Sequence, residues 1–368
     1  MIFKKELIKE IKDMLSFFKQ KSILDLTNIV YLKHDKLYYV NSDFHISIDI
    51  PNINDEIAVN IDEFMKVISL LKKDTNIEIL EKKLKLDNYL INLNEGYKEY
   101  IRRNINCDYI EKMYNDYSLV ISKNHINQII NLHNFTAEKS QCRDFLKGIH
   151  VIYKNNKLYF EATNGAYLAR YSYQNKEMNI DYIIPNEIFI FLSKIKYNND
   201  LEIKYENKYF VAKLSNNIKI KSAFKEGRFP CIEDVLPNKY NVECIFNFKE
   251  IYDIVKDCNS ILDKDSIGVL FNLKEKKVYA LNKELQKISS YDLTVKSINI
   301  FNKEKFEEQY NIFLLNHKFL LNCLKQYEIY NPNIKTLIIN YIDNERAFIL
   351  GKEKGKEILL MPKRYEGE

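Results

Sequence analysis

Several residue types that often mark a recognisable chemistry are scarce in this chain. It has no tryptophan, eight glycines and six prolines among 368 residues. Its six cysteines include no CxxC pair, and no histidine lies at ligand spacing from them; they are Cys107, Cys142, Cys231, Cys244, Cys258 and Cys323. This pattern favours scattered buried thiols in a reducing cytosol over a zinc site or a disulfide framework. We therefore expect no metal and no cofactor.

The chain also lacks a long apolar run. No stretch of about 18 apolar residues occurs, and charges interrupt the apolar residues of the N-terminal segment MIFKKELIKEIKDMLSFFKQK. We expect neither a signal peptide nor a membrane span, and hence a cytoplasmic protein.

Arginine is scarce as well, with seven among 56 basic residues. The net charge of +5 permits a nucleic-acid partner without requiring one. Lysine is a point charge suited to phosphates, whereas sequence readout in the major groove relies on the guanidinium fork. Any DNA binding should therefore be blind to sequence. The bias toward Lys, Asn, Ile and Tyr is what an AT-rich genome encodes.

No catalytic constellation is recognisable. The histidines at 34, 45, 125, 133, 150 and 317 are dispersed, and no carboxylates cluster at metal-binding spacing. The segment Gly351–Lys356 has three residues between its glycines and no Ser or Thr after the lysine, so it predicts a hairpin turn rather than a phosphate loop. A nuclease or hydrolase on an unrelated α+β fold is one hypothesis, which metal-dependent turnover would support.

What the chain does have is an internal repeat. VNIDEFMKVISLLKK precedes NIEILEKKLKL, IPNEIFIFLSKIK precedes DLEIKYENKYF, and a looser copy begins at Leu315. Ile77 follows Phe64 by thirteen positions, and Leu201 follows Ile188 by thirteen positions as well. Copies of one unit must pack against each other, and three units of about 120 residues divide the chain evenly. We predict domains at 1–116, 117–240 and 241–368.

Each third also opens with a short strand and an amphipathic helix, and the repeated segments described above form a second such pair halfway through it. Six strand-helix units therefore make up the chain. Segments between helices alternate at period two, such as KLYYVNSDFHISIDI and KLYFEATNGAYLARYSY. Alternation of this kind predicts half-buried antiparallel strands joined by tight turns, for example at Asn155-Asn156 and Glu206-Asn207. The predicted fold class is α+β, rich in strands.

The helices predict which face is buried. In the first, Leu7, Ile11, Leu15 and Phe18 share an apolar face, opposite a face with Lys5, Lys9, Lys12 and Lys19. For a single helix, a solvated surface explains such a stripe. If the helices lined a ring, the stripes would form a positive channel, weakened by Glu6, Glu10, Asp253 and Asp257.

Three further segments carry a family resemblance. They are FLKGIHVIYKNNKLYFEATNGAYLAR at 145–170, EGRFPCIEDVLP at 226–237, and LLMPKRY from Leu359. In this order and at these separations they resemble the β sliding clamp of bacterial DNA polymerase III. That family has a TDGHRLA-type hairpin in its central domain, then GRFPDY before VLP, and a chain end of MPMR.

The resemblance implies three tandem clamp domains, each a pair of strand-helix-strand repeats, closing head-to-tail into a ring-shaped homodimer whose helices surround duplex DNA. It implies a non-catalytic processivity factor that tethers the replicative polymerase. For the dimer interface it suggests Ile261, Leu262 and a strand near Tyr100. The implied DNA-facing residues are Lys5, Lys9, Lys12, Lys19, Lys21, Lys66, Lys73, Lys123, Asn127, Gln141, Lys249, Lys256, Lys318 and Lys325.

The resemblance also implies a pocket for short peptides of the polymerase, the clamp loader and repair proteins. Carried over by position, it comprises Leu146, Thr163, Gly165, Tyr167, Leu168, Pro230, Val235, Leu359, Leu360, Met361, Pro362 and Arg364. An aliphatic concave site with an adaptable methionine suits several hydrophobic motifs. The same leucines and valine are also what an ordinary core would contain.

The chain departs from the family pattern at four positions, where it has Asn164, Ala166, Tyr167 and Asp234. An acid at the pocket rim would change which peptides bind. A further hypothesis follows from these departures and from the mixed charge of the helices: a diverged scaffold, encoded on a mobile element, that binds partner peptides without encircling DNA.

Overall fold

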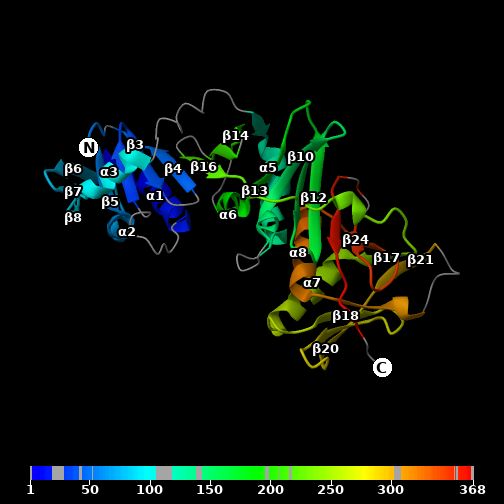
Figure 1. The fold of residues 1–368 in the computed structure, drawn as a ribbon. Helices are drawn as coiled ribbons and strands as arrows, with labels where there is room; N and C mark the ends of the chain where they lie inside the picture. Colours follow the sequence, from blue (N-terminus) through cyan, green and yellow to red (C-terminus); the bar gives the residue numbers. More distant parts are fainter. Residues whose placement is uncertain are drawn as a thin grey trace. The chain divides into compact units, whose positions relative to one another are not determined.

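The computed structural model describes residues 2–18, 29–40, 44–51, 53–104, 118–137, 143–194, 199–206, 208–214, 218–301, 308–351, 353 and 355–365. Helices and antiparallel sheets are both present, and the predicted α+β class is confirmed (Figure 1). The chain divides into two compact units, Met1–Ile126 with Phe191–Phe224 (unit 1) and Asn127–Ile190 with Lys225–Glu368 (unit 2).

Unit 1 contains two antiparallel sheets. The smaller has the order β1 (Ile2–Phe3), β6 (Thr75–Leu80), β7 (Lys83–Leu86), β8 (Tyr89–Asn92). The larger has the order β5 (Ile57–Asn60), β2 (Ile29–Lys33), β3 (Lys36–Val40), β4 (Phe44–Asp49), β16 (Ile218–Ala223), β15 (Tyr209–Lys213), β14 (Leu201–Glu206), β9 (Leu119–Ile121). The helices α1 (Lys5–Phe18) and α2 (Ile61–Leu70) pack against each other.

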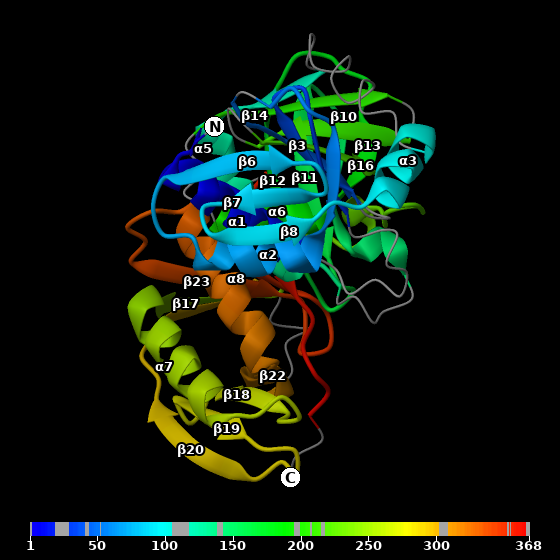
Figure 2. The same cartoon turned by 90° about the vertical axis from the view of Figure 1, so that its left-hand side faces the viewer.

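Unit 2 also contains one long and one short sheet. The long sheet has the order β13 (Asp181–Pro185), β10 (Gly148–Lys154), β11 (Lys157–Thr163), β12 (Tyr167–Gln174), β25 (Ile358–Leu360), β24 (Phe348–Leu350), β23 (Thr336–Tyr341), β17 (Val242–Asn247), β21 (Val295–Ile300). The short one has the order β20 (Lys287–Asp292), β19 (Lys277–Leu281), β18 (Gly268–Asn272), β22 (Ile312–Leu315). Two helices, α7 (Phe248–Ile261) and α8 (His317–Tyr330), run side by side (Figure 2).

The six predicted helices all form, and three of them begin with the same local signal. Asn60, Asn247 and Asn316 are the N-caps of α2, α7 and α8, and each side chain accepts a hydrogen bond from a backbone N–H of the first turn. The remaining three are α1, α6 (Asn186–Lys194), and α5 (Lys123–Ile129) with its 3₁₀ continuation η2 (Ile130–Phe135). In three of the six units, the repeat therefore consists of a strand, an asparagine cap and an amphipathic helix.

The buried face of α1 differs by one position from the prediction. Ile8, Ile11, Met14 and Leu15 are buried, whereas Leu7 is half-buried. The side chain of Phe18 lies outside the described residues. Because 3.6 residues complete a turn, the spacing 8, 11, 15 fits one stripe as well as 7, 11, 15 does, and packing selects between them.

The predicted strand near Tyr100 is wrong, because this segment forms a helix, α3 (Glu95–Asn104). Asn94 caps it by accepting a hydrogen bond from the Tyr97 N–H at 3.1 Å. Tyr97, Tyr100 and Ile101 follow the spacing of a helix face. They pack on a cluster in the larger sheet of unit 1, made of Ile29, Tyr31, Tyr38 and Ala58. Burial of this aromatic stripe against the sheet favours the helix.

The predicted boundaries at residues 116 and 240 differ from those of the two compact units. Asp116 lies outside the described residues. Strand pairing extends across both predicted boundaries, since β16 pairs with β4 and β12 pairs with β25. The unit boundaries instead fall within α5 and α6, and at 224–225. The division into three domains stays a prediction.

Candidate functional site

The motif TNGAYLA forms the turn between β11 and β12. Asn164 Oδ1 accepts hydrogen bonds from the N–H groups of Ala166 (2.9 Å) and Tyr167 (3.2 Å), and Gly165 adopts a φ of +93°. Thr163 Oγ1 donates to the Tyr167 carbonyl at 2.8 Å. The positive φ explains the glycine, and the Asn and Thr side chains close the turn locally. Leu168 is thereby held opposite Thr163 in the hairpin.

The end of the chain adds a strand to this hairpin. In β25, Leu359 pairs with Leu168 and Leu360 with Tyr167, and the Met361 N–H donates to the Ala166 carbonyl at 2.8 Å. Successive residues of a strand point to opposite faces. Leu359 and Met361 therefore face one way, and Leu360 faces the other and is fully buried.

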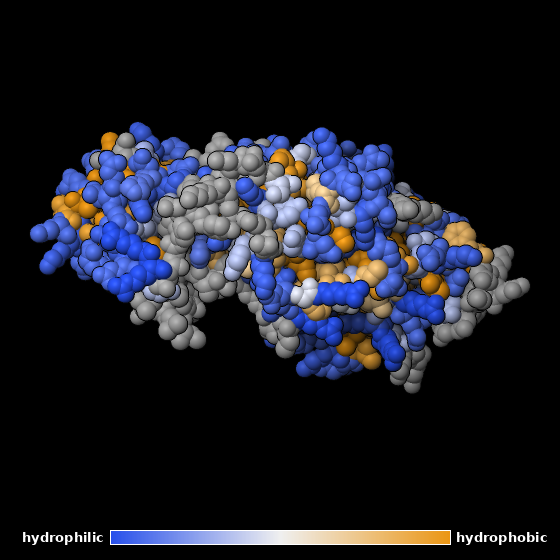
Figure 3. Space-filling view, turned by 45° about the horizontal axis from the view of Figure 1, so that its top comes forward, coloured by the Kyte–Doolittle hydropathy of each residue, from blue (hydrophilic) through white to orange (hydrophobic). Residues whose placement is uncertain are grey.

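The GRFP segment supplies a further wall. Phe229 and Ile232 are buried in a cluster with Leu168, Ile183 and Leu359, joined by Ala347 and Ile349. Val235, just past the 3₁₀ helix η4 (Ile232–Asp234), remains 52% exposed. In the space-filling view, hydrophobic residues gather over unit 2 in a patch surrounded by hydrophilic ones (Figure 3).

These segments enclose a cavity of about 300 Å³, which we call the apolar pocket. It is lined by Arg143, Phe145, Leu146, Thr163, Gly165, Ala166, Tyr167, Leu168, Arg228, Pro230, Ile232, Val235, Ala347, Leu359 and Met361. Nine of the twelve residues named from the sequence are brought together here. Leu360 and Pro362 do not line it, and Arg364 lines a separate cavity beside Tyr310 and Asp343.

Six lining residues were not named from the sequence. Phe145, Ala166 and Ile232 lie inside the quoted motifs, and Arg228 is the arginine of GRFP, so the motifs themselves could have indicated them. Arg143 and Ala347 lie outside the motifs, and no sequence pattern marks them.

The Tyr167 ring does not form a polar rim. It is 5% exposed and stacks on Phe319 of α8, with ring centroids 4.3 Å apart, and it meets Phe135 of η2 in a tilted contact at 4.8 Å. Its hydroxyl donates to the Asn134 carbonyl. The expected acidic rim is also not formed by Asp234, which is exposed and does not line the pocket. The charged side chains that do line it are Arg143 and Arg228.

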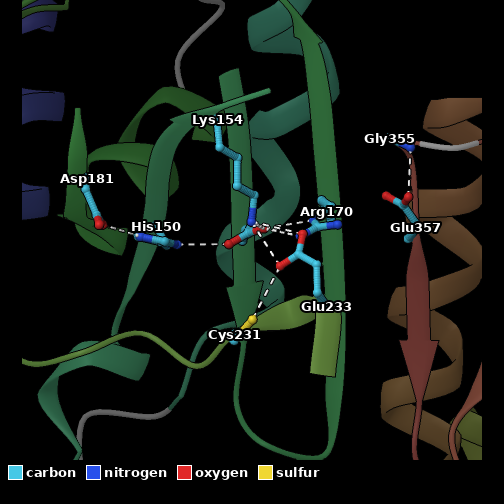
Figure 4. A network of polar contacts seen from close by, with 9 residues as sticks. His150, Lys154, Arg170, Asp181, Cys231, Glu233, Gly355 and Glu357 are labelled. Atoms are coloured by element: carbon cyan, nitrogen blue, oxygen red, sulfur yellow. Dashed lines mark hydrogen bonds and ion pairs between the residues drawn. The ribbon is translucent and has the colours of Figure 1, made fainter. Parts of the chain in front are cut away.

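A second cavity of about 550 Å³ lies on the other side of the GRFP segment, and we call it the polar pocket. His150, Lys154, Arg170 and Glu233 converge here (Figure 4). His150 Nδ1 lies 2.9 Å from Glu161 and its Nε2 lies 2.8 Å from Asp181. Arg170 bonds both Glu161 (2.8 Å) and Glu233 (2.6 Å), and Lys154 bonds Glu233 at 3.0 Å.

This network sets the charge of its carboxylates. Burial alone would raise the pKa of Glu233, but hydrogen bonds from Lys154 and Arg170 lower it to about 2. For Glu161, burial is likewise outweighed by the hydrogen bond from His150 and the charge of Arg170, and the pKa is lowered. Both carboxylates are therefore ionised at neutral pH.

The polar pocket includes Cys231, His150 and Asp181, which are the residue types of the catalytic triad of a cysteine hydrolase. The geometry does not suit that chemistry. Both His150 ring nitrogens are hydrogen-bonded to carboxylates, and Cys231 Sγ lies 3.6 Å from a Glu233 oxygen instead. No ring nitrogen is left to take the thiol proton. Within the described ranges, no group of three or more His, Cys, Asp and Glu side chains is placed to hold a metal ion.

The predicted DNA-facing side chains are exposed wherever the structure describes them. These are Lys5, Lys9, Lys12, Lys66, Lys73, Lys123, Asn127, Lys249, Lys256, Lys318 and Lys325. Lys249 forms an ion pair with Asp253 at 2.7 Å, so its charge is partly neutralised. Lys19, Lys21 and Gln141 lie outside the described residues.

The predicted interface residues differ in exposure. Ile261 is 48% exposed at the end of α7, whereas Leu262 is 6% exposed and Tyr100 is half-buried on α3. On β8, an edge strand of its sheet, Tyr89 is 39% and Leu90 52% exposed. None of the helices that the structure describes is long and apolar enough to cross a membrane.

Similarity to known proteins agrees with the motifs that build the apolar pocket. Residues 120–231 match the family description "DNA polymerase III beta subunit, central domain". The chain is 25% identical to a beta sliding clamp of Staphylococcus aureus over 278 residues, which cover 70% of this chain and 72% of that protein. It is 22% identical to a beta sliding clamp of Staphylococcus epidermidis over 379 residues, covering 97% of each.

The fold agrees with solved structures. The DNA polymerase sliding clamp of Bacillus subtilis superposes with a TM-score of 0.79 at 16% identity, covering 99% of this chain and 98% of that one. The DNA polymerase III beta chain of Streptococcus pneumoniae also gives a TM-score of 0.79, at 17% identity, covering 99% of each chain. The chain is therefore similar in sequence to bacterial beta sliding clamps, matches the central domain of the DNA polymerase III beta subunit over residues 120–231, and has the fold of these clamps.

Proposed function

We propose that this chain is a DNA sliding clamp, a processivity factor without enzymatic activity that encircles duplex DNA and tethers the replicative polymerase. The observation that carries this is the apolar pocket, which three separate sequence motifs build within a clamp fold. A replication clamp of a bacterium acts in the cytoplasm, where the chromosome lies.

The ring requires a head-to-tail dimer. Such an interface joins two different surfaces and closes on itself. The edge strands β8 in unit 1 and β20 in unit 2 offer two such surfaces, because unpaired strand edges are templates for pairing. Tyr89 and Leu90 on β8, and Ile261, Leu285 and Ile288 near β20, are exposed apolar residues for this contact. Tyr100, which lies on the helix α3, stays a prediction for this contact.

The exposed lysines of the helices contact the DNA. A closed ring cannot leave DNA sideways, so its phosphate contacts need only be few, mobile and indifferent to sequence. We expect a shallow salt dependence and no sequence preference.

The apolar pocket takes short hydrophobic peptides of the replicative polymerase, the clamp loader and repair proteins. Its floor is rigid because Leu168, Ile232 and Leu359 belong to the core. Its exposed edge, Val235 and Met361, can adapt to different side chains.

Two measurements test the ring. Sedimentation should give about twice the 44.0 kDa mass of one chain. A labelled protein threaded onto linear duplex DNA should be trapped once both DNA ends are blocked by a bulky protein, and should be released when a nuclease cuts between the blocks. Escape past blocked ends at the rate seen with open ends contradicts encirclement.

Under the scaffold hypothesis, the protein binds peptides in the apolar pocket but does not form a ring around DNA. The Lys249–Asp253 ion pair favours it, because it reduces the positive charge of α7. A monomer that binds hydrophobic peptides and is never trapped on end-blocked DNA is the result that this hypothesis predicts.

A further inference from the structure

The two pockets of unit 2 share one wall. Arg228, Pro230 and Ile232 line both the apolar pocket and the polar pocket. The wall is a single stretch of backbone, and Gly227, with a φ of +113°, starts it. A peptide seated in the apolar pocket that continues past this wall reaches the polar pocket within a few residues. The polar pocket is therefore placed to bind the flank of such a peptide.

The carboxylates of the polar pocket already have hydrogen-bond partners within the chain itself. Glu161 is 1% exposed and bonds Arg170 and His150. Glu233 bonds Lys154 and Arg170, and Asp181 bonds His150. A cationic ligand would have to compete with these partners. At Glu161, whose side chain is buried, the cost of leaving a buried charge unpaired opposes that exchange.

Within the described ranges, two basic side chains of the polar pocket, those of Lys225 and Arg228, are unpaired instead. Lys225 is half-buried and Arg228 exposed, and neither side chain has a hydrogen-bond or ion-pair partner among the residues that the structure describes. The Lys225 N–H donates to the Ile183 carbonyl at 2.9 Å, which holds this residue at the pocket through its backbone and leaves the ammonium group available. Unpaired cations beside a concave site attract carboxylates.

We propose that the polar pocket binds an acidic residue flanking the hydrophobic motif of the partner peptide, with Lys225 and Arg228 receiving its carboxylate. The proposal rests on the proposed function, because the apolar residues of the same peptide occupy the apolar pocket. It makes the polar pocket a specificity element: an acidic flank is favoured, a neutral flank is tolerated and a basic flank is disfavoured.

The test uses fluorescein-labelled peptides with the apolar core Leu-Thr-Leu-Phe and a flank of Asp-Asp, Asn-Asn or Lys-Lys on either side. Binding is measured by anisotropy at low ionic strength. On one side of the core, Asp-Asp should bind about fivefold more tightly than Asn-Asn, as a partly desolvated charge pair permits. Lys-Lys should bind more weakly than both. Salt should reduce the difference.

The variants assign the effect to the pocket. In the Lys225→Gln, Arg228→Gln double variant, the preference for Asp-Asp should fall below about twofold. Lys239→Gln, which changes an exposed lysine outside both pockets, should keep it. If thermal unfolding shows that the double variant is destabilised, Arg228→Gln alone, at an exposed position, should still lose part of the preference.

The outcomes separate this proposal from the function on which it rests. If no peptide binds the unmodified protein, the peptide site of the proposed function fails. If peptides bind but the Asp and Asn flanks bind equally well, or the double variant keeps the full preference, only the proposal for the polar pocket is overturned.

Discussion

The backbone N–H of Met361 donates to the carbonyl of Ala166 at 2.8 Å. This bond fastens the last strand of the chain to the turn of the β11–β12 hairpin. Met361 thereby stands beside Leu168, with its side chain 41% exposed. The apolar pocket exists because these two distant segments are adjacent strands of one sheet.

Truncating the pocket side chains should weaken peptide binding. We expect Met361→Ala and Leu168→Ala each to reduce the affinity for a hydrophobic peptide by more than about 1 kcal/mol, as buried anchors do. Fluorescence anisotropy with a labelled peptide measures this affinity. Met361 gives the cleaner result, because Leu168 is 4% exposed and its loss also destabilises the fold.

Val120→Ala is a matched control, since Val120 is 50% exposed and does not line the pocket. It should leave the affinity unchanged. Equal affinities for the parent protein and both pocket variants would place the peptide site elsewhere.

Tyr167 should act on stability more than on peptide binding. Tyr167→Phe keeps the ring contacts with Phe319 and Phe135 and removes the hydrogen bond to Asn134. We expect a loss of about 1 kcal/mol in the free energy of unfolding, with peptide affinity nearly unchanged. Tyr167→Ala should cost about 3–5 kcal/mol through the cavity it leaves. A large affinity loss in Tyr167→Phe at unchanged stability would instead make the hydroxyl part of the binding site.

Two glycines near the site should respond differently to alanine. A Cβ at Gly148 would lie 2.5 Å from the backbone oxygen of Ile184 in the neighbouring strand, and the two strands would have to separate. A Cβ at Gly165 meets nothing within 4 Å, so only its φ of +93° is strained. We expect Gly165→Ala to cost about 1 kcal/mol and Gly148→Ala to cost clearly more. Chemical denaturation measures both, and the reverse order would contradict this account.

Acid should destabilise the protein through buried histidines. Burial, with the nearby charges of Lys318 and Lys363, lowers the pKa of His317 to about 4. The unfolded chain therefore binds a proton near pH 6.5 that the folded chain binds only near pH 4. Stability from this group is complete above about pH 6.5 and falls with acidification across that window, by up to about 1.4 kcal/mol per pH unit.

His317→Leu should flatten part of this slope, measured by denaturation between pH 7 and 4. Part of the slope of stability against pH should remain in this variant, because burial and the charge of Lys221 also lower the pKa of His45 to about 4. An unchanged slope in the variant would mean that His317 does not titrate with the unfolding transition.

Local signals in the sequence determined the helices, the hairpin turn and the order of the motifs. An asparagine before an apolar period of 3.6 begins α2, α7 and α8, and a Gly with positive φ makes the TNGAYLA turn possible. These features depend on residues within a few positions of each other, so they can be predicted from the chain alone.

Tertiary structure decided what the pocket is made of. Arg143 and Ala347 line it, the Tyr167 ring is buried against Phe319, and Arg228 lines both this pocket and the polar pocket. It also decided that Tyr100 lies on a helix, because burial against Ile29 and Tyr31 selects that conformation. Such contacts join residues far apart in sequence. Their free energy comes from burial and pairing in the folded sheet, which no short stretch of sequence encodes.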